Sequence, residues 1–393
     1  MDPTPDDGSI AIDSTVVLSV ARATVGRPAV ELDEWRVEPL KGMGFNASIH
    51  RVAGTVLDEG KSMPWSVIRK CVRDTGGDAS EIRYWKREPL AYASGELEQL
   101  AAIHVPRCVQ QDEDASGIVL WLEDVDGADG PWTIPRFETV ARDLGRLGGA
   151  YTVGRPLPRA PWLSRGWLAA WVEQAATAFD GFSTAVIDPL LARMYPPEVA
   201  DAMVALWESR SRIYGVLSGA PQVLGHLDAV PANVMVRAGR TTLIDWAFVG
   251  HAALGEELGS LVGGCTAFGD TSPDELPSVD AAAFAAYIDG LRDVGWDGDT
   301  DIVRFGYCSA AALRYCVAPA AHFVRGVNAD GSIADGVGIR DPDQRTFFEA
   351  SLGRPFEELL TTSAATFRFL ARGLGREALQ LLRTLELDAR MQA

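Results

Sequence analysis

The chain of 393 residues contains few lysines and no long hydrophobic stretch. No apolar run approaches the ~20 residues that a helix needs to cross a lipid bilayer, so we expect no membrane partner. Because lysine is scarce, a lysine at a position suited to binding phosphate is especially informative. The four lysines are Lys41, Lys61, Lys70 and Lys86.

Cysteine is sparse as well, with five residues in the chain. Their odd number and irregular spacing fit neither a zinc site nor a disulfide framework, so we expect reduced thiols in a cytoplasmic protein. Residues 1–9 are acidic and contain prolines, whereas a signal peptide begins basic and then becomes apolar. We therefore expect no signal peptide. The cysteines are Cys71, Cys108, Cys265, Cys308 and Cys316.

Acidic residues outnumber basic ones by 54 to 36, which gives a net charge of −18 and a pI near 4.7. Such a chain would repel nucleic acid, and a small molecule is the expected partner. The acidity either attracts a cationic substrate or only keeps the protein soluble, and the sequence leaves both interpretations open. The length allows two or three domains, or one enzyme with two lobes around a cleft.

One segment combines two carboxylates and an amide between short apolar stretches. It begins His226-Leu227-Asp228, continues to Asn233, and is followed by Asp245. Residues 234–236 and 242–244 resemble two strands joined by a turn at residues 238–240. Such a hairpin would return Asp245 to the side of Asn233, where their oxygens suit Mg²⁺ completed by phosphate oxygens. Asp228, outside that metal pair, is then available to accept a proton.

The spacing His-x-Asp-x-x-x-x-Asn over His226, Asp228 and Asn233, with Asp245 17 residues after Asp228, resembles the catalytic loop of the protein-kinase-like superfamily. Pro231 and the Ile-Asp-Trp around Asp245 are most similar to its aminoglycoside-phosphotransferase branch, the antibiotic kinases. The resemblance implies an α+β, bilobal protein-kinase-like fold. A small antiparallel β-sheet N-lobe with a helix would span residues 1–122, a hinge 123–130, and a larger, mainly helical C-lobe with the catalytic hairpin 131–393.

Three strands are expected in the N-lobe, over residues 34–40, 47–52 and 65–72. Gly42, Gly44 and Asn46 lie in the loop of the first hairpin, where the resemblance places a loop that covers the nucleotide phosphates. The full Gly-x-Gly-x-x-Gly pattern is missing, so an ordinary hairpin turn is an open alternative.

The third strand contains Val-Ile-Arg-Lys, which resembles the kinase Val-Ala-Ile-Lys and assigns the phosphate-binding role to Lys70. Its expected partner is Glu88, with Glu81 as the second choice. Solvated surface charges without a functional pair are an open alternative. Strands over residues 105–109 and 117–122 then lead into the hinge. There the backbone of Glu123 and Val125 is expected to contact the nucleotide base.

Helices are expected over residues 135–151, 163–182, 196–217, 281–294, 301–318, 345–359 and 363–390. Glu257 stands where the family usually has aspartate, and we expect Glu257 and His251 to help shape the acceptor site. Arg314 lies in an apolar helix and needs a partner. That partner is either an anionic group of the substrate or an internal carboxylate.

The expected function is therefore a kinase that uses ATP or GTP with Mg²⁺ to phosphorylate a hydroxyl of an antibiotic-like acceptor, which would confer resistance. An aminoglycoside, a sugar-containing antibiotic or a nucleoside antibiotic fits this description. Alternatives are a housekeeping kinase for a sugar, choline or an amino alcohol, and a pseudokinase that only binds nucleotide. No Ala-Pro-Glu motif follows Asp245, so a protein acceptor is not expected. The oligomeric state is left open.

Overall fold

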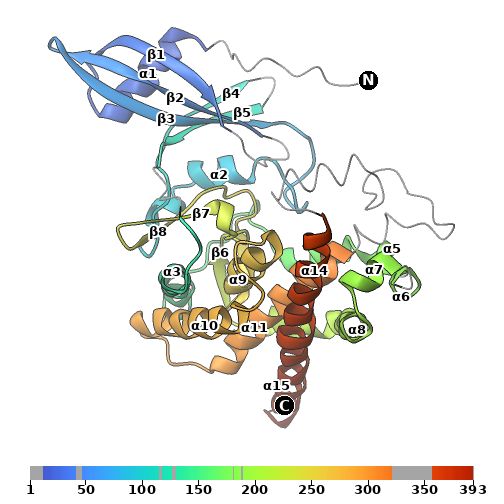
Figure 1. Ribbon diagram of the computed structural model, residues 1–393. Helices are drawn as coiled ribbons and strands as arrows, with labels where there is room; N and C mark the ends of the chain where they lie inside the picture. The colour runs from blue at the N-terminus through green and yellow to red at the C-terminus, as the bar shows by residue number, and fades with distance from the viewer. Residues whose placement is uncertain are drawn as a thin grey trace. The chain divides into compact units, whose positions relative to one another are not determined.

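The structure is a computed structural model that describes residues 12–40, 47–114, 117–125, 130–179, 181–186, 189–320 and 356–392. The chain divides into two compact units, residues 1–100 with 104–127 and residues 101–103 with 128–393. An antiparallel sheet dominates the N-terminal unit, and helices dominate the C-terminal unit (Figure 1). The mixed α+β fold expected from the sequence is confirmed.

The N-terminal sheet has five antiparallel strands in the order β1-β2-β3-β5-β4. The expected strand over residues 105–109 starts too early, because β4 begins only at Cys108. Pro106 explains the difference, since proline has no N–H to donate to a strand ladder. The strands are β1 (Glu31–Pro39), β2 (Ala47–Asp58), β3 (Lys61–Arg73), β4 (Cys108–Asp114) and β5 (Gly117–Glu123).

Helix α1 (Ser14–Val25) covers one face of this sheet. Its first turn is capped by Asp13, whose carboxylate accepts the Thr15 N–H at 2.7 Å. Buried side chains of α1 pack with alternate residues of β3 and β5, among them Val67, Val119 and Trp121.

The intervening residues of the same strands point to the opposite face, because side chains alternate along a strand. Val72, Ile118, Leu120 and Leu122 form a second apolar cluster there with Trp85. Helix α2 (Arg87–Ala93) and the 3₁₀ turn η1 (Leu97–Gln99) follow Trp85 in the chain. The two faces of the sheet are thus buried by different parts of the unit.

The C-terminal unit is built mainly from long helices. The single helix expected over residues 163–182 is wrong: it divides into α4 (Trp167–Glu173), α5 (Ala176–Phe179) and α6 (Phe182–Ala185). Phe179 instead stacks on Trp207, with 4.7 Å between ring centroids, and Phe182 contacts Tyr195 edge-on. The expected helix over residues 345–359 lies mostly outside the described residues.

The remaining helices agree more closely with the sequence-based expectation, and two of them contain π-helical turns. They are α3 (Ile134–Thr152), α7 (Pro189–Met194), α8 (Pro197–Gly219), α9 (Glu256–Phe268), α10 (Leu276–Asp293), α11 (Thr300–Ala312) with its π-helical continuation η3 (Leu313–Val317), α14 (Phe356–Phe367), the π-helical η4 (Arg368–Gly375) and α15 (Arg376–Gln392).

Two small antiparallel ribbons lie between α8 and α9 in the chain. The first pairs β6 (Gln222–Gly225) with β9 (Gly250–Ala253). The second is the expected hairpin, in which β7 (Val234–Arg237) pairs with β8 (Arg240–Leu243). Its turn residues Ala238 and Gly239 both have positive φ, as a tight two-residue hairpin turn requires. The 3₁₀ turn η2 (Pro231–Asn233) directly precedes this hairpin.

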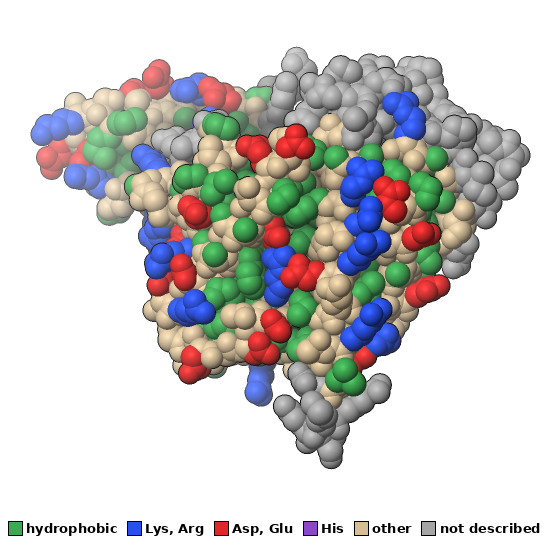
Figure 2. Space-filling model, turned by 60° about the horizontal axis from the view of Figure 1, so that its bottom comes forward, with side chains coloured by type: hydrophobic (Ala, Val, Ile, Leu, Met, Phe, Trp, Pro, Cys, Tyr) green, Lys and Arg blue, Asp and Glu red, His purple; other side chains and the backbone are tan. Residues whose placement is uncertain are grey.

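Acidic and basic side chains are interspersed with hydrophobic ones on the face shown in Figure 2. Ion pairs in the C-terminal unit join several of the charges, such as Arg142 and Arg146 with Asp293 at 2.7 Å each. In the part of the chain that is described, no helix is both long enough and apolar enough to cross a membrane.

Helices α3 and α10 approach each other so closely that glycine is required at their contact. A Cβ on Gly145 would lie 2.2 Å from the carbonyl oxygen of Tyr287, and one on Gly290 would lie 2.0 Å from that of Arg142. Both clashes involve helix backbone, which cannot move without shifting the whole helix.

Replacing Gly145 with alanine should therefore destabilise the protein by about 1–3 kcal/mol, the usual cost of overpacking. The matched control is Gly215→Ala on α8, where an added Cβ meets no atom within 4 Å. That change should raise stability by up to about 1 kcal/mol, because alanine favours helix. Urea denaturation measures both, and a Gly145→Ala variant as stable as Gly215→Ala would contradict the packing described here.

Candidate functional site

The loop between β6 and β7 is held from within by His226. The Nε2 of this buried ring lies 2.8 Å from the Ile244 carbonyl oxygen, and its Nδ1 accepts the Asp228 N–H at 3.2 Å. The two contacts require the tautomer with its proton on Nε2. The ring also packs edge-on against Trp246, with 4.6 Å between centroids. His226 thereby ties the loop to the end of the hairpin.

Leu227 adopts a left-handed backbone conformation, with φ of 64°. This is an unfavourable region for a leucine, and surrounding contacts must hold it there. Its N–H donates to Glu257 Oε2 at 3.1 Å, and its carbonyl accepts a hydrogen bond from Arg314 Nη1. Both sides of the strained peptide are therefore fixed by buried charged side chains.

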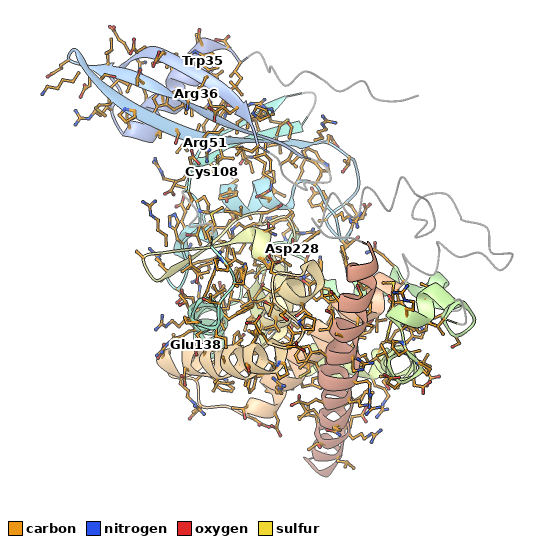
Figure 3. The ribbon with its side chains drawn as sticks, viewed as in Figure 1. Trp35, Arg36, Arg51, Cys108, Glu138 and Asp228 are labelled. Carbon is orange, nitrogen blue, oxygen red and sulfur yellow. The ribbon has the colours of Figure 1, made fainter. Side chains whose placement is uncertain are left out.

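Asp228, labelled in Figure 3, follows this bend. Both of its carboxylate oxygens are engaged. Oδ1 forms an ion pair with Arg314 Nη2, and Oδ2 accepts a hydrogen bond from Asn233 Nδ2 at 2.9 Å. Its side chain is nevertheless 20% exposed. The carboxylate thus has a fixed orientation and an accessible edge.

Arg314 lies on η3, and the sequence left its partner undecided. Its side chain is 7% exposed, and Nη1 also donates to Ser260 Oγ at 2.9 Å. The guanidinium carbon lies 4.4 Å from the ring centroid of Trp167, within cation–π range. Of the two partners considered, an internal carboxylate is present, and it is Asp228.

Asn233 and Asp245 flank the two ends of the hairpin. The Ile244 N–H donates to the Asn233 carbonyl at 3.0 Å, which brings Asn233 beside the residue that precedes Asp245. Asp245 has φ of 64°, a conformation that aspartate tolerates better than most residues. Because Asn233 Nδ2 is bound to Asp228, the remaining side-chain atom is the oxygen Oδ1.

A carboxamide oxygen and a carboxylate suit Mg²⁺, which binds a few protein oxygens and completes its shell with phosphate and water. Within the described ranges, no group of three or more His, Cys, Asp and Glu side chains could hold a metal. A site made from Asn233 and Asp245 with phosphate oxygens needs no such group. The donor types therefore fit the expected metal.

Two adjacent glutamates at the start of α9 lie close to this loop. Burial raises the pKa of Glu256 to about 7, against a hydrogen bond from the Ala253 N–H that lowers it. Burial also raises the pKa of Glu257, opposed by the nearby His226 and Arg314. Glu257 is 4% exposed and accepts the Leu227 N–H, so it supports the loop from below. Its expected part in shaping the acceptor site stays a prediction.

His251, the other residue expected near the acceptor, lies on β9 and is only partly exposed. Its Nε2 lies 2.7 Å from the carbonyl oxygen of Pro158. That contact attaches the segment before α4 to the β6–β9 ribbon. The expected part of His251 in shaping the acceptor site stays a prediction.

In the N-terminal unit, Lys70 Nζ and Glu88 Oε2 lie 2.6 Å apart, and both side chains are buried. Lys70 pairs with Leu120 in the sheet and so shares the face on which α2 lies, whereas Arg69 pairs with Trp121 on the other face. Glu81, the second choice, interacts with the Asp78 N–H at 3.3 Å. Gly42, Gly44 and Asn46 lie outside the described residues.

Glu123, at the end of β5, accepts the Arg107 N–H at 3.1 Å, and Val125 follows two residues later. Between them, Asp124 binds Arg51 at 2.7 Å and Ser66 Oγ at 2.8 Å. Arg51 is on β2 (Figure 3). Asp124 was missed by sequence reasoning, although an acid directly after a buried strand could have indicated such a contact. It fixes the chain as it leaves the sheet.

Residues 80–297 match the model of the phosphotransferase enzyme family, APH, over more than half of the chain. The chain belongs to this family. The match includes Glu88, Asp228, Asn233 and Asp245, while Lys70 and Arg314 lie outside it. The resemblance to this phosphotransferase family, inferred from the motif, is confirmed. Among curated proteins, no sequence matches this phosphotransferase-family chain.

An aminoglycoside phosphotransferase from Alicyclobacillus acidocaldarius has a similar fold, with a TM-score of 0.53 at 15% identity over 95% of this chain and 98% of that chain. An amicoumacin kinase in complex with AMP-PNP, Ca²⁺ and Ami gives 0.49 at 13% identity, covering 88% and 97% of the two chains. A choline/ethanolamine kinase family protein from Mesorhizobium loti gives 0.49 at 12%, covering 94% and 99%. The first supports the kinase-like fold.

The raised pKa of Glu256 predicts a specific dependence of stability on pH. The folded protein holds this proton up to about pH 7, while the unfolded chain releases it near its ordinary value of 4.5. Stability should therefore fall as the pH rises through this window, since the folded state binds more protons there.

Glu256→Gln keeps an oxygen for the Ala253 N–H but cannot ionise. The variant should equal the wild type in Tm near pH 5 and exceed it near pH 8. Glu377→Gln is the contrasting control, because a hydrogen bond from Arg304 lowers the pKa of Glu377. Replacing this carboxylate with a neutral amide should destabilise the protein at pH 8. A Glu256→Gln advantage that does not grow with pH would show that the carboxyl is not the titrating group.

Proposed function

We propose that this phosphotransferase-family protein is a small-molecule kinase that transfers the γ-phosphate of ATP or GTP to a hydroxyl group. The observation that carries the proposal is the accessible edge of the Asp228 carboxylate, whose two oxygens are fixed by Arg314 and Asn233. An acceptor hydroxyl can bind at that edge without any rearrangement of the loop. Residues 1–122 would bind nucleotide, 123–130 would act as a hinge, and 131–393 would bind metal and acceptor.

Asn233 and Asp245 would hold the Mg²⁺ of the nucleotide, which supplies positive charge to the phosphate oxygens when bound. Lys70 would bind the α- and β-phosphates. Its ion pair with Glu88 at 2.6 Å supports this role, because it keeps a buried ammonium charged and in one orientation. Gly42, Gly44 and Asn46, with the backbone of Glu123 and Val125, would complete the nucleotide site.

In the transfer step, the acceptor oxygen forms a bond to the γ-phosphorus. The bond from that phosphorus to the β–γ bridging oxygen breaks, and the nucleoside diphosphate (ADP or GDP) leaves with that oxygen. The hydroxyl proton passes to the carboxylate of Asp228. In a loose transition state this proton moves late, so orientation of the hydroxyl matters more than the strength of the base.

The acceptor would be a compact hydroxylated molecule rather than a protein. Only residues 246–249 separate Asp245 from β9, and α9 begins soon afterwards. That spacing leaves no room for the activation segment on which protein kinases dock peptides. Within this class we favour an antibiotic and a role in resistance, in the cytoplasm. The free state of all five cysteines supports a reducing compartment.

A sugar, choline or an amino alcohol is the second candidate acceptor, because the family resemblance does not separate housekeeping kinases from antibiotic kinases. The pseudokinase alternative is less well supported. A module that only binds nucleotide has no use for a carboxylate held as Asp228 is held, with both oxygens in fixed hydrogen bonds.

The test is to incubate the protein with γ-labelled ATP and GTP, Mg²⁺ and a panel of aminoglycosides, nucleoside antibiotics, sugars and amino alcohols. Label should appear in a small-molecule phosphate ester with at least one acceptor. A parallel incubation with cell lysate should also place the label in the small-molecule fraction. Label on proteins, or nucleotide binding with no transfer to any acceptor, would refute the proposal.

Lys70→Ala should reduce the rate of transfer by about 100-fold, because phosphates misplaced by about 1 Å react that much more slowly. Arg69→Ala should reduce the rate by less than about threefold. The two residues are neighbours on β3 but point to opposite faces, with Lys70 toward Glu88 and Arg69 toward Trp121. Initial rates at saturating acceptor measure the difference. Larger losses for Arg69→Ala would reverse the assignment.

Asp228→Asn should abolish transfer while leaving nucleotide affinity within a few-fold of the wild type. Asparagine keeps the shape of the side chain but cannot take the proton, and Asp228 is not assigned to the metal. Single-turnover transfer and equilibrium nucleotide binding measure the two effects. Near-normal transfer in this variant would rule out Asp228 as the proton acceptor.

A further inference from the structure

Arg314 is a buried charge that contacts the proposed proton acceptor and the loop that carries it. Its guanidinium contacts the carboxylate of Asp228, the carbonyl of Leu227 and the hydroxyl of Ser260. The side chains of Trp167 and Tyr315 pack near the guanidinium carbon, at 4.4 and 4.9 Å from their ring centroids. These contacts join η3 and α9 to the loop between β6 and β7.

We propose that Arg314 is a positioning residue of the transfer reaction, which acts through Asp228 and does not touch the substrate. This inference rests on the proposed function. The arginine fixes two things at once: the direction of the carboxylate through Nη2, and the strained bend at Leu227 through Nη1. Without it, the carboxylate would keep only its hydrogen bond to Asn233 and could rotate about that contact.

The geometry explains why the accessible edge of Asp228 has a defined direction. A carboxylate offers about four lone-pair sites on its two oxygens. Arg314 occupies a site on Oδ1 and Asn233 a site on Oδ2. The remaining sites can accept a hydrogen bond from an acceptor hydroxyl, because the side chain is 20% exposed. Errors of about 1 Å in such positioning cost on the order of 100-fold in rate.

The contact set requires arginine rather than a generic cation. One nitrogen binds the Leu227 carbonyl and Ser260 while another binds Asp228, and the planar group lies over Trp167. A lysine ammonium is a compact charge that cannot span both groups or stack in this way. Arg314→Lys should therefore keep the buried charge and the fold but only part of the positioning.

Arg304 provides a matched control for a purely structural role. It lies on α11, the helix that continues into η3, and is itself bound by two carboxylates, Asp280 at 2.6 Å and Glu377 at 2.7 Å. Asp280 lies on α10 and Glu377 on α15, so neither carboxylate belongs to the loop that carries Asp228. Arg304→Ala should lower Tm but leave the kcat of transfer within about twofold.

Arg314→Ala should lower kcat for the fastest acceptor of the panel by about 100-fold and change nucleotide affinity by less than about threefold. The kcat of Arg314→Lys should lie between that of Arg314→Ala and that of the wild type. Added guanidinium chloride should restore part of the kcat of Arg314→Ala, and urea, which has the same planar shape without the charge, should not. A kcat unaffected by Arg314→Ala and Arg314→Lys, or equal effects of guanidinium and urea, would overturn the inference.

Thermal unfolding tests the ion pair without relying on transfer. The Tm losses of Arg314→Ala and Asp228→Asn should not add in the double variant, because each change removes the same pair. Additive losses would overturn the inference even if Arg314→Ala is inactive. If Arg314→Ala does not fold, Arg314→Lys carries both measurements. If the wild-type protein transfers phosphate to no acceptor, the proposed function fails and the inference fails with it. If the wild type transfers phosphate and the Arg314 variants have the same kcat, only the inference is refuted.

Discussion

The carboxylate of Asp228, held between Arg314 on one oxygen and Asn233 on the other, is the contact on which the rest of the C-terminal unit depends. Asn233 reaches it only because η2 precedes the β7–β8 hairpin, and Arg314 reaches it only because α11 continues as the π-helical η3. π-helical turns are uncommon and often occur at functional sites. The helical segment α11–η3 thus brings a donor 86 residues away to a carboxylate that Asn233, five residues away, contacts as well.

Buried charged and polar side chains surround this carboxylate. His226, Glu257 and Arg314 are all buried, and each forms a hydrogen bond with the backbone of Leu227 or Asp228. Burying charged groups is costly unless they are paired and hydrogen-bonded. Here the pairing also maintains the left-handed bend at Leu227, a conformation that leucine does not adopt without support.

Local patterns predicted much of the fold and of the site, because those patterns act over short distances. Hydrophobic alternation on β3 set Lys70 and Arg69 on opposite faces, and the turn at Ala238 and Gly239 predicted the hairpin. The pair of Arg314 with Asp228 spans 86 residues and could not be found by spacing. The burial of Glu257 was missed for the same reason, since the sequence does not show which face of α9 meets the loop.

The central claim is that Asn233 and Asp245 hold a nucleotide's metal beside Asp228. Calorimetric titration of AMP-PNP into the wild type and Asp245→Ala, each with Mg²⁺ and with EDTA, tests this claim most directly and needs no acceptor. Affinity should be strong only for the wild type with Mg²⁺. Asp245→Ala should bind with the same low affinity under both conditions. An Asp245→Ala variant that gains as much affinity from Mg²⁺ as the wild type does would contradict the account.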